Sequence, residues 1–237
     1  MTRPIVEIVI EGPGMNALST PLIRRLRDEF EAAGSAPVLL RGAGAAFSAG
    51  LDLKEVAGLD PQGMETFLRN LEALVGRMFD HEGPVVAAVN GHAIAGGAVL
   101  AMCCDAVVAT TNPKARIGLN EVALGLQFPP IVLRAMTHRL DPRHRAEVLL
   151  GAALHRPEDA LRLGIVDALD PDCDGAARTR LERLARHPPV AFAATKAALR
   201  AGVTNVSEPE YARFVREVVP AWTSGEVKAR LRAALAR

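Results

Sequence analysis

The chain has 237 residues, of which 49% are hydrophobic, and its 28 Lys and Arg residues are balanced by 27 Asp and Glu residues. This length is sufficient for one large domain with a sizeable core. A net charge of +1 gives no general attraction to nucleic acid or to an anionic membrane. Charged residues or prolines interrupt every apolar stretch before it reaches the roughly 18 residues of a transmembrane helix. We therefore expect a protein with no nucleic-acid partner and no membrane partner.

Cysteine and histidine usage excludes two further classes. Cys103 and Cys104 are adjacent, and the three cysteines form neither a disulfide framework nor a CxxC pair. The six His residues show no ligand spacing such as HExxH, so we expect no metal. The N-terminal residues pass directly into strand-like alternation with no leader pattern, which predicts a cytoplasmic protein.

The N-terminal two thirds of the chain is predicted to be α/β. Apolar residues alternate weakly over residues 5–10, and short continuous apolar runs of the kind found in strands covered on both faces follow at residues 38–40, 85–89 and 106–109. Between the first two runs, Ser19 is placed to cap a helix with Pro21 in its first turn. Leu22, Leu26 and Phe30 recur every four residues as the buried stripe of that helix.

The remainder of the chain is predicted to be mainly helical. One helix is predicted between Asp141 as its N-cap, with Pro142 as its first residue, and Gly151 as its terminator. A second is predicted from Pro157 to Gly164 by the same pattern of proline and glycine.

Three longer helical patterns then cover residues 175–187, 189–201 and 208–235, in which Phe214 and Trp222 are expected in the core or at a subunit contact. We divide the chain into an α/β core over residues 1–175 and a helical region over residues 176–237.

Two glycine-rich segments follow predicted strands: "RGAGAAFSAGLDLKE" at residues 41–55 and "VNGHAIAGGAVLAMCCD" at residues 89–105. Phe47 occupies the place of the third glycine of a dinucleotide-binding fingerprint, which argues against that class. Gly96 and Gly97 are placed to open a helix, where free N–H groups suit an anion or a developing oxyanion. Each segment by itself could equally provide only tight turns.

A single acid, Glu121, lies in the otherwise apolar stretch "IGLNEVALG" at residues 117–125. An apolar environment disfavours a carboxylate and raises its pKa towards the range of a proton carrier near neutral pH. The alternative is a partly exposed carboxylate in the first turn of a helix, stabilised by the helix dipole.

Together, the segments "AFSAGLDLKE", "NGHAIAGG" and "IGLNEVALG" resemble the crotonase superfamily of acyl-CoA enzymes, and in particular its Δ3,Δ2-enoyl-CoA isomerases. The resemblance extends from "MNALS" near the start, through "EDALRLGIVD", to the last helix. It implies an α/β fold built as a spiral of ββα units, with a helical C-terminal region that forms trimers, often paired into hexamers. It also implies an acyl-CoA thioester as the substrate.

The resemblance assigns roles to individual residues. The backbone N–H groups of Leu51 and Gly96 match the pair that holds the thioester oxygen, and Glu121 matches the catalytic glutamate. The first loop, through Ser48, Ala49 and Leu53, matches the segment that lines the adenine end of CoA. No cofactor is implied, because CoA arrives as part of the substrate.

One position departs from the hydratases of this superfamily. They carry a second glutamate three positions after the oxyanion glycine, where this chain has Val99. Adding water requires groups that position the water and deliver a proton, whereas moving a double bond needs one carboxylate that reaches both carbons. Val99 therefore favours an isomerase that shifts a 3-enoyl-CoA double bond to the 2-enoyl position.

Two alternatives stay open. The chain could be a hydratase-like or other crotonase-superfamily enzyme, with Asp52 or Glu55 as the nearest other acids of these segments. It could also be a non-enzymatic acyl-CoA-binding or assembly subunit. His92 lies between the two oxyanion candidates in the sequence, and we expect it to be a hydrogen-bonded structural residue.

Overall fold

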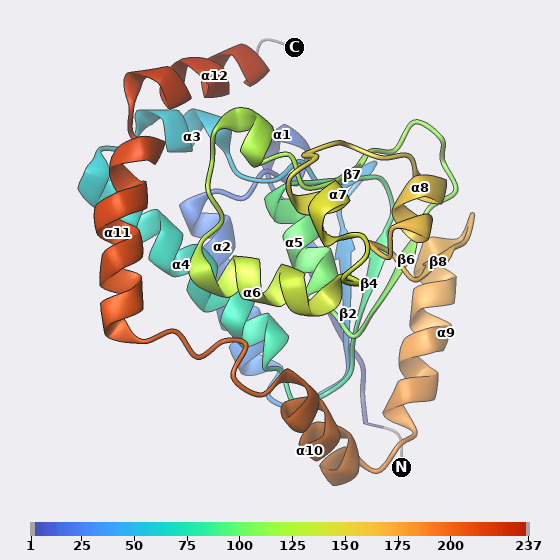
Figure 1. Cartoon of the computed structure of the whole chain (residues 1–237). Coiled ribbons are helices and arrows are strands. Elements are labelled where there is room, and N and C mark those ends of the chain that lie inside the picture. Colours follow the sequence, from blue (N-terminus) through green and yellow to red (C-terminus); the bar gives the residue numbers. More distant parts are fainter. Residues whose placement is uncertain (1–2, 236–237) are drawn as a thin grey trace.

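The computed structural model describes residues 3–235 and contains two parallel sheets surrounded by helices (Figure 1). The larger sheet has the order β1-β2-β4-β6-β8, with the bounds Val6–Ile10, Val38–Gly42, Val85–Val89, Ala106–Ala109 and Ala168–Leu169. The smaller has the order β3-β5-β7, with the bounds Ala46–Ser48, His92–Ile94 and Ile117–Gly118. The strands predicted from the four apolar runs are all confirmed as members of the larger sheet.

The chain alternates between the two sheets in a repeating order. β2 is followed by β3, β4 by β5 and β6 by β7, so each pair places its first strand in the larger sheet and its second in the smaller. A helix completes each unit, in the order α4 (Pro61–Phe79), α5 (Gly96–Met102) and α6 (Pro130–Arg139). This arrangement confirms the predicted α/β class, a spiral of ββα units.

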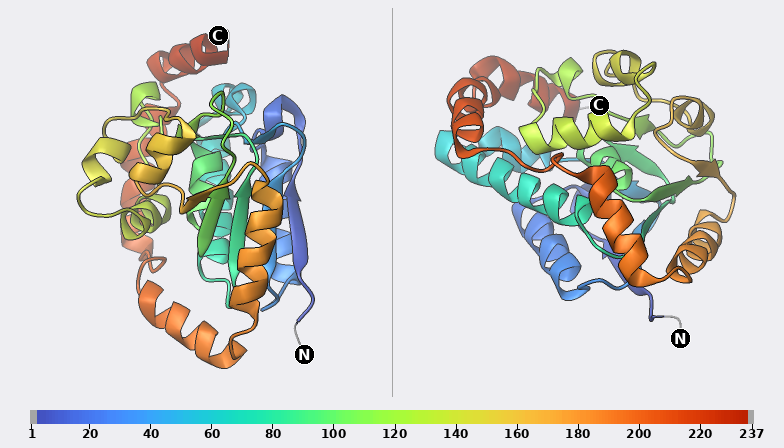
Figure 2. Two further views of the ribbon diagram at one scale, coloured as in Figure 1. Left: turned by 90° about the vertical axis from the view of Figure 1, so that its right-hand side faces the viewer. Right: turned by 60° about the horizontal axis from the view of Figure 1, so that its bottom comes forward.

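The larger sheet is buried on both faces because helices cover both of its sides, to which alternate residues of each strand point. Leu39, Val86 and Val108 pack against Ala177 and Leu181 of α9 (Cys173–Ala185). The alternate positions, such as Leu40 and Val107, belong to the main core together with α4, α5 and α2 (Thr20–Ala32). Figure 2 shows α9 on one side of the sheet and the helices of the main core, such as α2 and α4, on the opposite side.

The remaining helices connect and cover these layers. Their bounds are α1 Pro13–Asn16, α3 Leu53–Gly58, the 3-10 helix η1 Val122–Leu124, α7 Arg145–Leu149, α8 Pro157–Arg162, α10 Pro189–Arg200, α11 Glu208–Trp222 and α12 Gly225–Leu235. The Ser19 hydroxyl caps α2 by accepting the Leu22 N–H, as predicted. Phe214 and Trp222 are buried in the main core, which confirms the first of the two locations expected for them.

Two helix predictions need correction, and one long helix was missed. Asp141 and Pro142 do not begin a helix: an Asp141 carboxylate oxygen accepts the Arg143 N–H and its carbonyl accepts the His144 N–H, forming a turn, and α7 starts only at Arg145. The pattern over residues 208–235 is interrupted by a cap at Thr223, which separates α11 from α12. The 19-residue helix α4 was not predicted at all.

The C-terminal helices extend from the core and then return to it. α10 lies at one end of the molecule, and α11 and α12 run back along α4 and α3 towards the other end (Figure 1). The division at residues 175 and 176 falls inside α9, which packs on the sheet, and it stays a prediction, as do the trimer and the hexamer. None of the helices over residues 3–235 has the length and apolar character needed to cross a membrane.

Candidate active site

Leu51 is fixed by a parallel bridge to Leu18. The Leu18 N–H donates to the Gly50 carbonyl at 2.7 Å, and the Asp52 N–H donates to the Leu18 carbonyl at 3.1 Å. In an extended segment, successive backbone groups point to opposite sides. The Leu51 N–H therefore points away from Leu18, and it donates no hydrogen bond within residues 3–235.

Gly96 begins α5 after a strained residue. Ala95 has φ 48° and ψ −120°, a conformation that costs a non-glycine residue about 1–3 kcal/mol. The Ala95 N–H donates to the Gly118 carbonyl at 2.8 Å, and its carbonyl accepts the Val99 N–H at 2.9 Å. As the first residue of the helix, Gly96 has an N–H with no intrahelical acceptor, and no described residue accepts it.

The two donor segments lie against each other. A Cβ built on Gly50 would be only 2.6 Å from the Ile94 carbonyl and 3.3 Å from the Gly96 nitrogen, and Gly50 has φ +89°. A Cβ built on Gly96 would be 3.1 Å from the Leu51 side chain. Glycine at position 50 thus permits both the turn and the close approach of two peptide groups whose N–H groups are free.

The loop that carries Leu51 depends on Asn16, a residue to which the sequence analysis gave no role. The side-chain NH2 group of Asn16 donates to the carbonyls of Ala43 and Ala46 at 2.9 Å each, and the backbone carbonyl of Asn16 accepts the Ser48 hydroxyl at 2.8 Å. The "MNALS" segment was the available signal, although nothing in it shows that Asn16 reaches a loop 30 residues away.

The three residues expected to line the adenine end of CoA differ in accessibility. Ser48 is fully buried, and its hydroxyl also accepts the Gly50 N–H at 3.2 Å, so the side chain is used within the loop. Ala49 and Leu53 are partly exposed. Asp52 caps α3 by accepting the Lys54 and Glu55 N–H groups, so its carboxylate is used at the start of that helix.

Glu121 is buried, with 6% of its surface exposed, rather than lying in a solvated first turn. Its Oε2 atom has no hydrogen-bond partner among the described residues, and burial raises the pKa of the carboxyl group to about 7. A buried polar atom without a partner is unfavourable, and such atoms are often found where a ligand or water binds. Glu121 is thus a carboxyl group able to hold or release a proton near neutral pH.

The sheet brings Glu121 to the same end of the molecule as the two donors. β7 pairs with β5 through Ile94 and Gly118, so Glu121 follows β7 just as Gly96 follows β5 and Leu51 follows β3. Two further buried atoms on these segments have no partner among the described residues, His92 Nδ1 at the start of β5 and Asn120 Oδ1 next to Glu121 in the sequence. The expectation that His92 is fully hydrogen-bonded is therefore wrong for its Nδ1 atom.

Val99 is 2% exposed and lies one turn after Gly96 on α5. It places an apolar side chain at the position of the hydratases' second carboxylate. Over residues 3–235, no group of three or more His, Cys, Asp or Glu side chains is arranged to hold a metal ion.

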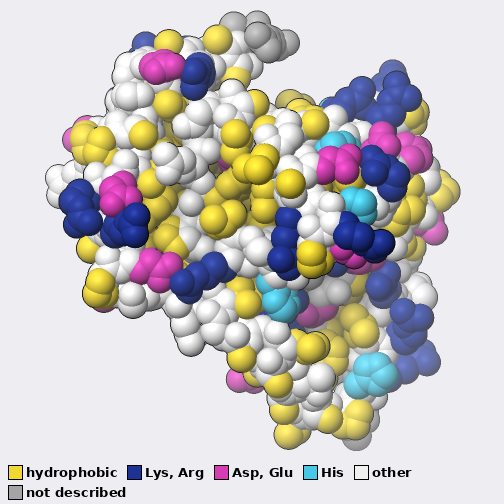
Figure 3. All heavy atoms as spheres, in the orientation of Figure 1, with side chains coloured by type: hydrophobic (Ala, Val, Ile, Leu, Met, Phe, Trp, Pro, Cys, Tyr) yellow, Lys and Arg dark blue, Asp and Glu magenta, His cyan; other side chains and the backbone are white. Residues whose placement is uncertain are grey.

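Apolar side chains surround the segment after Glu121. Val122, Leu126, Phe128 and Leu149 line a cavity of about 670 Å³. Figure 3 shows hydrophobic side chains gathered in a hollow on this face of the molecule. The Trp222 indole N–H donates to the Gln127 carbonyl at 3.3 Å, which attaches this segment to α11.

Comparisons of the sequence and of the structure with known proteins identify the same family. The sequence profile described as "Enoyl-CoA hydratase/isomerase" matches residues 2–228. The mouse protein "Enoyl-CoA delta isomerase 1, mitochondrial" is 37% identical over 126 residues, which is 53% of this chain and 44% of the mouse protein. A "Putative enoyl-CoA hydratase" of Thermus thermophilus is 33% identical over 189 residues, covering 78% of this chain and 74% of the relative.

Among solved structures, human mitochondrial delta3-delta2-enoyl-CoA isomerase superposes with a TM-score of 0.92, at 26% identity and with coverage of 98% of this chain and 93% of the human chain. The profile match, the ββα spiral and the superposition agree. The chain belongs to the enoyl-CoA hydratase/isomerase family of acyl-CoA enzymes, the crotonase superfamily.

Proposed function

We propose that the protein is an isomerase that converts a 3-enoyl-CoA into a 2-enoyl-CoA by proton transfer through Glu121. The observation that carries the proposal is the buried Glu121 carboxyl group, with a pKa of about 7, which follows a strand of the smaller sheet at the same end as two peptide N–H groups that donate to no described residue. The substrate's CoA group needs no separate cofactor.

In the first step, the Glu121 carboxylate removes a proton from C2 of the bound 3-enoyl thioester. The electron pair of the C2–H bond becomes part of a dienolate that extends from the thioester oxygen to C4. The C2 proton is far less acidic than a carboxylic acid. Stabilisation of the dienolate oxygen is therefore the main energetic requirement.

The N–H groups of Leu51 and Gly96 supply that stabilisation. Fixed peptide donors aimed at a developing oxyanion need no reorganisation, and loss of one such donor typically costs about 3–4 kcal/mol in the transition state. The strained turn at Ala95 and the Leu18 bridge hold the two donors before substrate binds.

In the second step, protonated Glu121 delivers the proton to C4, and the double bond forms between C2 and C3. Glu121 takes one proton from C2 and gives one proton to C4, so the substrate and the product have the same atoms and Glu121 returns to its starting state. The raised pKa suits both steps, since the group must first accept and then donate a proton near neutral pH.

The enzymatic alternative is a hydratase. It is favoured by the Thermus relative, which is named a putative hydratase and matches more of this chain than the mouse isomerase does. Val99 opposes it, because no second carboxyl group stands at that position to help to position water.

Kinetics with two substrates test the proposal and separate the candidates. An isomerase produces the ultraviolet absorbance of the conjugated 2-enoyl thioester from a 3-enoyl-CoA and leaves 2-enoyl-CoA unchanged. A hydratase consumes that absorbance when given 2-enoyl-CoA. If the protein binds both compounds and converts neither, it is an acyl-CoA-binding subunit and the proposal is wrong.

A further inference from the structure

A second cavity, of about 660 Å³, lies between α9 and α10. It borders Asp105 and Ala106, where β6 begins, whereas Leu51, Gly96 and Glu121 follow the carboxyl ends of strands. β3 begins only four residues after β2 ends, so the smaller sheet continues from the carboxyl end of the larger. The cavity is therefore at the opposite end of the molecule from the candidate active site.

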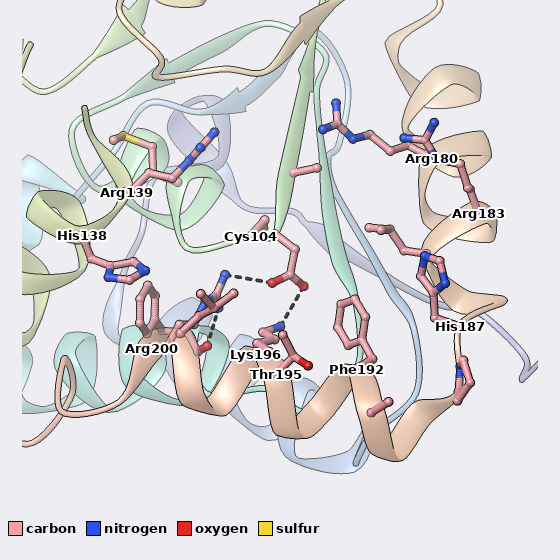
Figure 4. Close-up of a pocket in the computed structure, with 18 residues that line it drawn as sticks. Cys104, His138, Arg139, Arg180, Arg183, His187, Phe192, Thr195, Lys196 and Arg200 are labelled. Atoms are coloured by element: carbon pink, nitrogen blue, oxygen red, sulfur yellow. Dashed lines mark hydrogen bonds and ion pairs between the residues drawn. The ribbon is translucent and has the colours of Figure 1, made fainter.

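Cationic side chains dominate the polar part of this cavity. Arg180 and Arg183 on α9 are three residues apart and share a helix face, with His187 four residues further on. Figure 4 shows these residues on the α9 side and Lys196 and Arg200 opposite them on α10.

The cations on α10 already have partners. Asp105 binds Lys196 at 2.7 Å and Arg200 at 2.8 Å, and also accepts the Val85 N–H at 2.7 Å. One carboxylate is thus shared by two cations. Asp105 is the only acidic side chain that lines the cavity in the described part of the chain.

The two arginines of α9 that line the cavity have no ion-pair partner among the described residues. Within residues 3–235, neither Arg180 nor Arg183 forms an ion pair, although Arg178 on the same helix binds Glu7 at 2.7 Å. Two arginines without partners beside a cation pair with a single counter-ion produce an uncompensated positive field, which favours an anion.

Arg139, which also lines the cavity, is paired with Asp167 at 2.8 Å. Apart from His138 and Thr195, most of the remaining lining is apolar, with free backbone donors at the start of α10. Phe79, Met102, Leu184 and Phe192 provide an apolar and partly aromatic surface.

The cavity also reaches Pro188 and Ala191 at the start of the 12-residue helix α10. Pro188 and Pro189 carry no N–H, so the free donors of this first turn are the N–H groups of Val190 and Ala191, which have no intrahelical acceptor. A volume of 660 Å³ is within the usual range for small-molecule sites.

We propose that this cavity binds an amphipathic organic anion, namely a phosphate-bearing compound with an aromatic group. The phosphate would be held by Arg180, Arg183 and the first turn of α10, because arginine pairs with phosphate through two parallel hydrogen bonds. The aromatic group would pack against Phe192 and Met102. This site does not depend on the proposed isomerase activity.

The test uses 1-naphthyl phosphate, which has an aromatic ring and a phosphate but neither the adenine nor the pantetheine of CoA. Isothermal titration calorimetry of the full chain is expected to show binding that weakens with added salt. The double variant R180Q/R183Q is expected to raise Kd at least about tenfold, since a charge-assisted hydrogen bond contributes about 1.5–3 kcal/mol. Inorganic phosphate is expected to bind more weakly than the naphthyl ester.

Arg186→Gln is the control for charge, because it removes one arginine charge, half of what the double variant removes, just beyond the end of α9 from a residue that does not line the cavity. It is expected to bind 1-naphthyl phosphate as the original protein does. Both variants are expected to retain the thermal unfolding temperature and the KM for enoyl-CoA.

The proposal is overturned if 1-naphthyl phosphate does not bind at millimolar concentration, if R180Q/R183Q binds it as tightly as R186Q, or if inorganic phosphate binds equally well. It is also overturned if sedimentation shows that R180Q/R183Q dissociates an oligomer that R186Q preserves, since the cavity would then be closed by a second copy of the chain.

Discussion

The main-chain N–H of Ala95 donates to the carbonyl of Gly118 at 2.8 Å. This bond fixes the strand that leads to Glu121 against the turn that presents the Gly96 N–H. The spacing of acid and oxyanion donor is therefore determined by the smaller sheet rather than by flexible side chains, and disturbing that sheet should reduce catalysis more than stability.

Gly50→Ala tests this arrangement. The added methyl group would meet the Ile94 carbonyl at 2.6 Å and force the two donor segments apart. Because a displacement of about 1 Å can cost roughly 100-fold in rate, we expect kcat/KM for 3-enoyl-CoA to fall by about that factor.

Gly44→Ala, in the turn between β2 and β3, is the matched control. Gly44 also has a positive φ, +66°, but a Cβ there would meet nothing within 4 Å. We expect similar backbone strain with near-original kcat/KM. Equal losses of activity in the two variants would show that the strain matters rather than the separation of the donors.

The pH dependence of kcat/KM follows from the buried carboxyl group. Glu121 must be unprotonated to accept the C2 proton, and its pKa in the free protein is about 7. We expect kcat/KM to rise about tenfold per pH unit below pH 7 and to level off above it, as measured between pH 5 and 9. A profile that is flat from pH 5.5 to 8 would contradict the assignment.

Stability should show the opposite dependence. The folded pKa of Glu121, about 7, exceeds its ordinary value of 4.5, so the folded state retains a proton that the unfolded state loses between these values. Stability therefore decreases as pH rises through this window, by about 3 kcal/mol in total for this group. In urea unfolding, Glu121→Gln should be more stable than the original protein at pH 8.5, and the difference should disappear near pH 4.5. A Glu121→Gln variant that is less stable at pH 8.5 would be evidence against burial of the charge.

Much of the site could be predicted from the sequence because its functional groups are local. Leu51, Gly96 and Glu121 each lie within a short segment, and the glycines and the single acid mark those segments. The strands of the larger sheet are marked in the same way by continuous apolar runs. Strands β3, β5 and β7 have only three, three and two residues, too few for any periodic pattern.

What could not be predicted depends on contacts between distant segments. The Leu18 bridge and the Asn16 hydrogen bonds join residues about 30 positions apart. The α9–α10 cavity combines arginines of one helix with lysine and phenylalanine of the next, and each taken alone resembles an ordinary solvated helix face. Asp141 and Pro142 have the residue types of a helix start but form a turn instead.

Glu72 provides an internal control for Glu121. It is buried to a similar extent, with 3% exposed, burial raises its pKa to about 7, and its Oε2 atom also has no partner within residues 3–235. Its Oε1 atom accepts the Ile131 N–H at 2.8 Å at the start of α6. A glutamine can keep this bond, so Glu72→Gln should retain activity while removing an equally buried acid.

The most direct measurement is the rate at which Glu121→Gln isomerises 3-enoyl-CoA, compared with Glu72→Gln and the original protein, with thioester binding measured on the same samples. General acid–base catalysis typically contributes about 10²–10⁴-fold, so we expect Glu121→Gln to bind the thioester normally and to lose at least 100-fold in kcat, while Glu72→Gln stays within a few-fold of the original. Isomerisation by Glu121→Gln at the original rate would contradict the account.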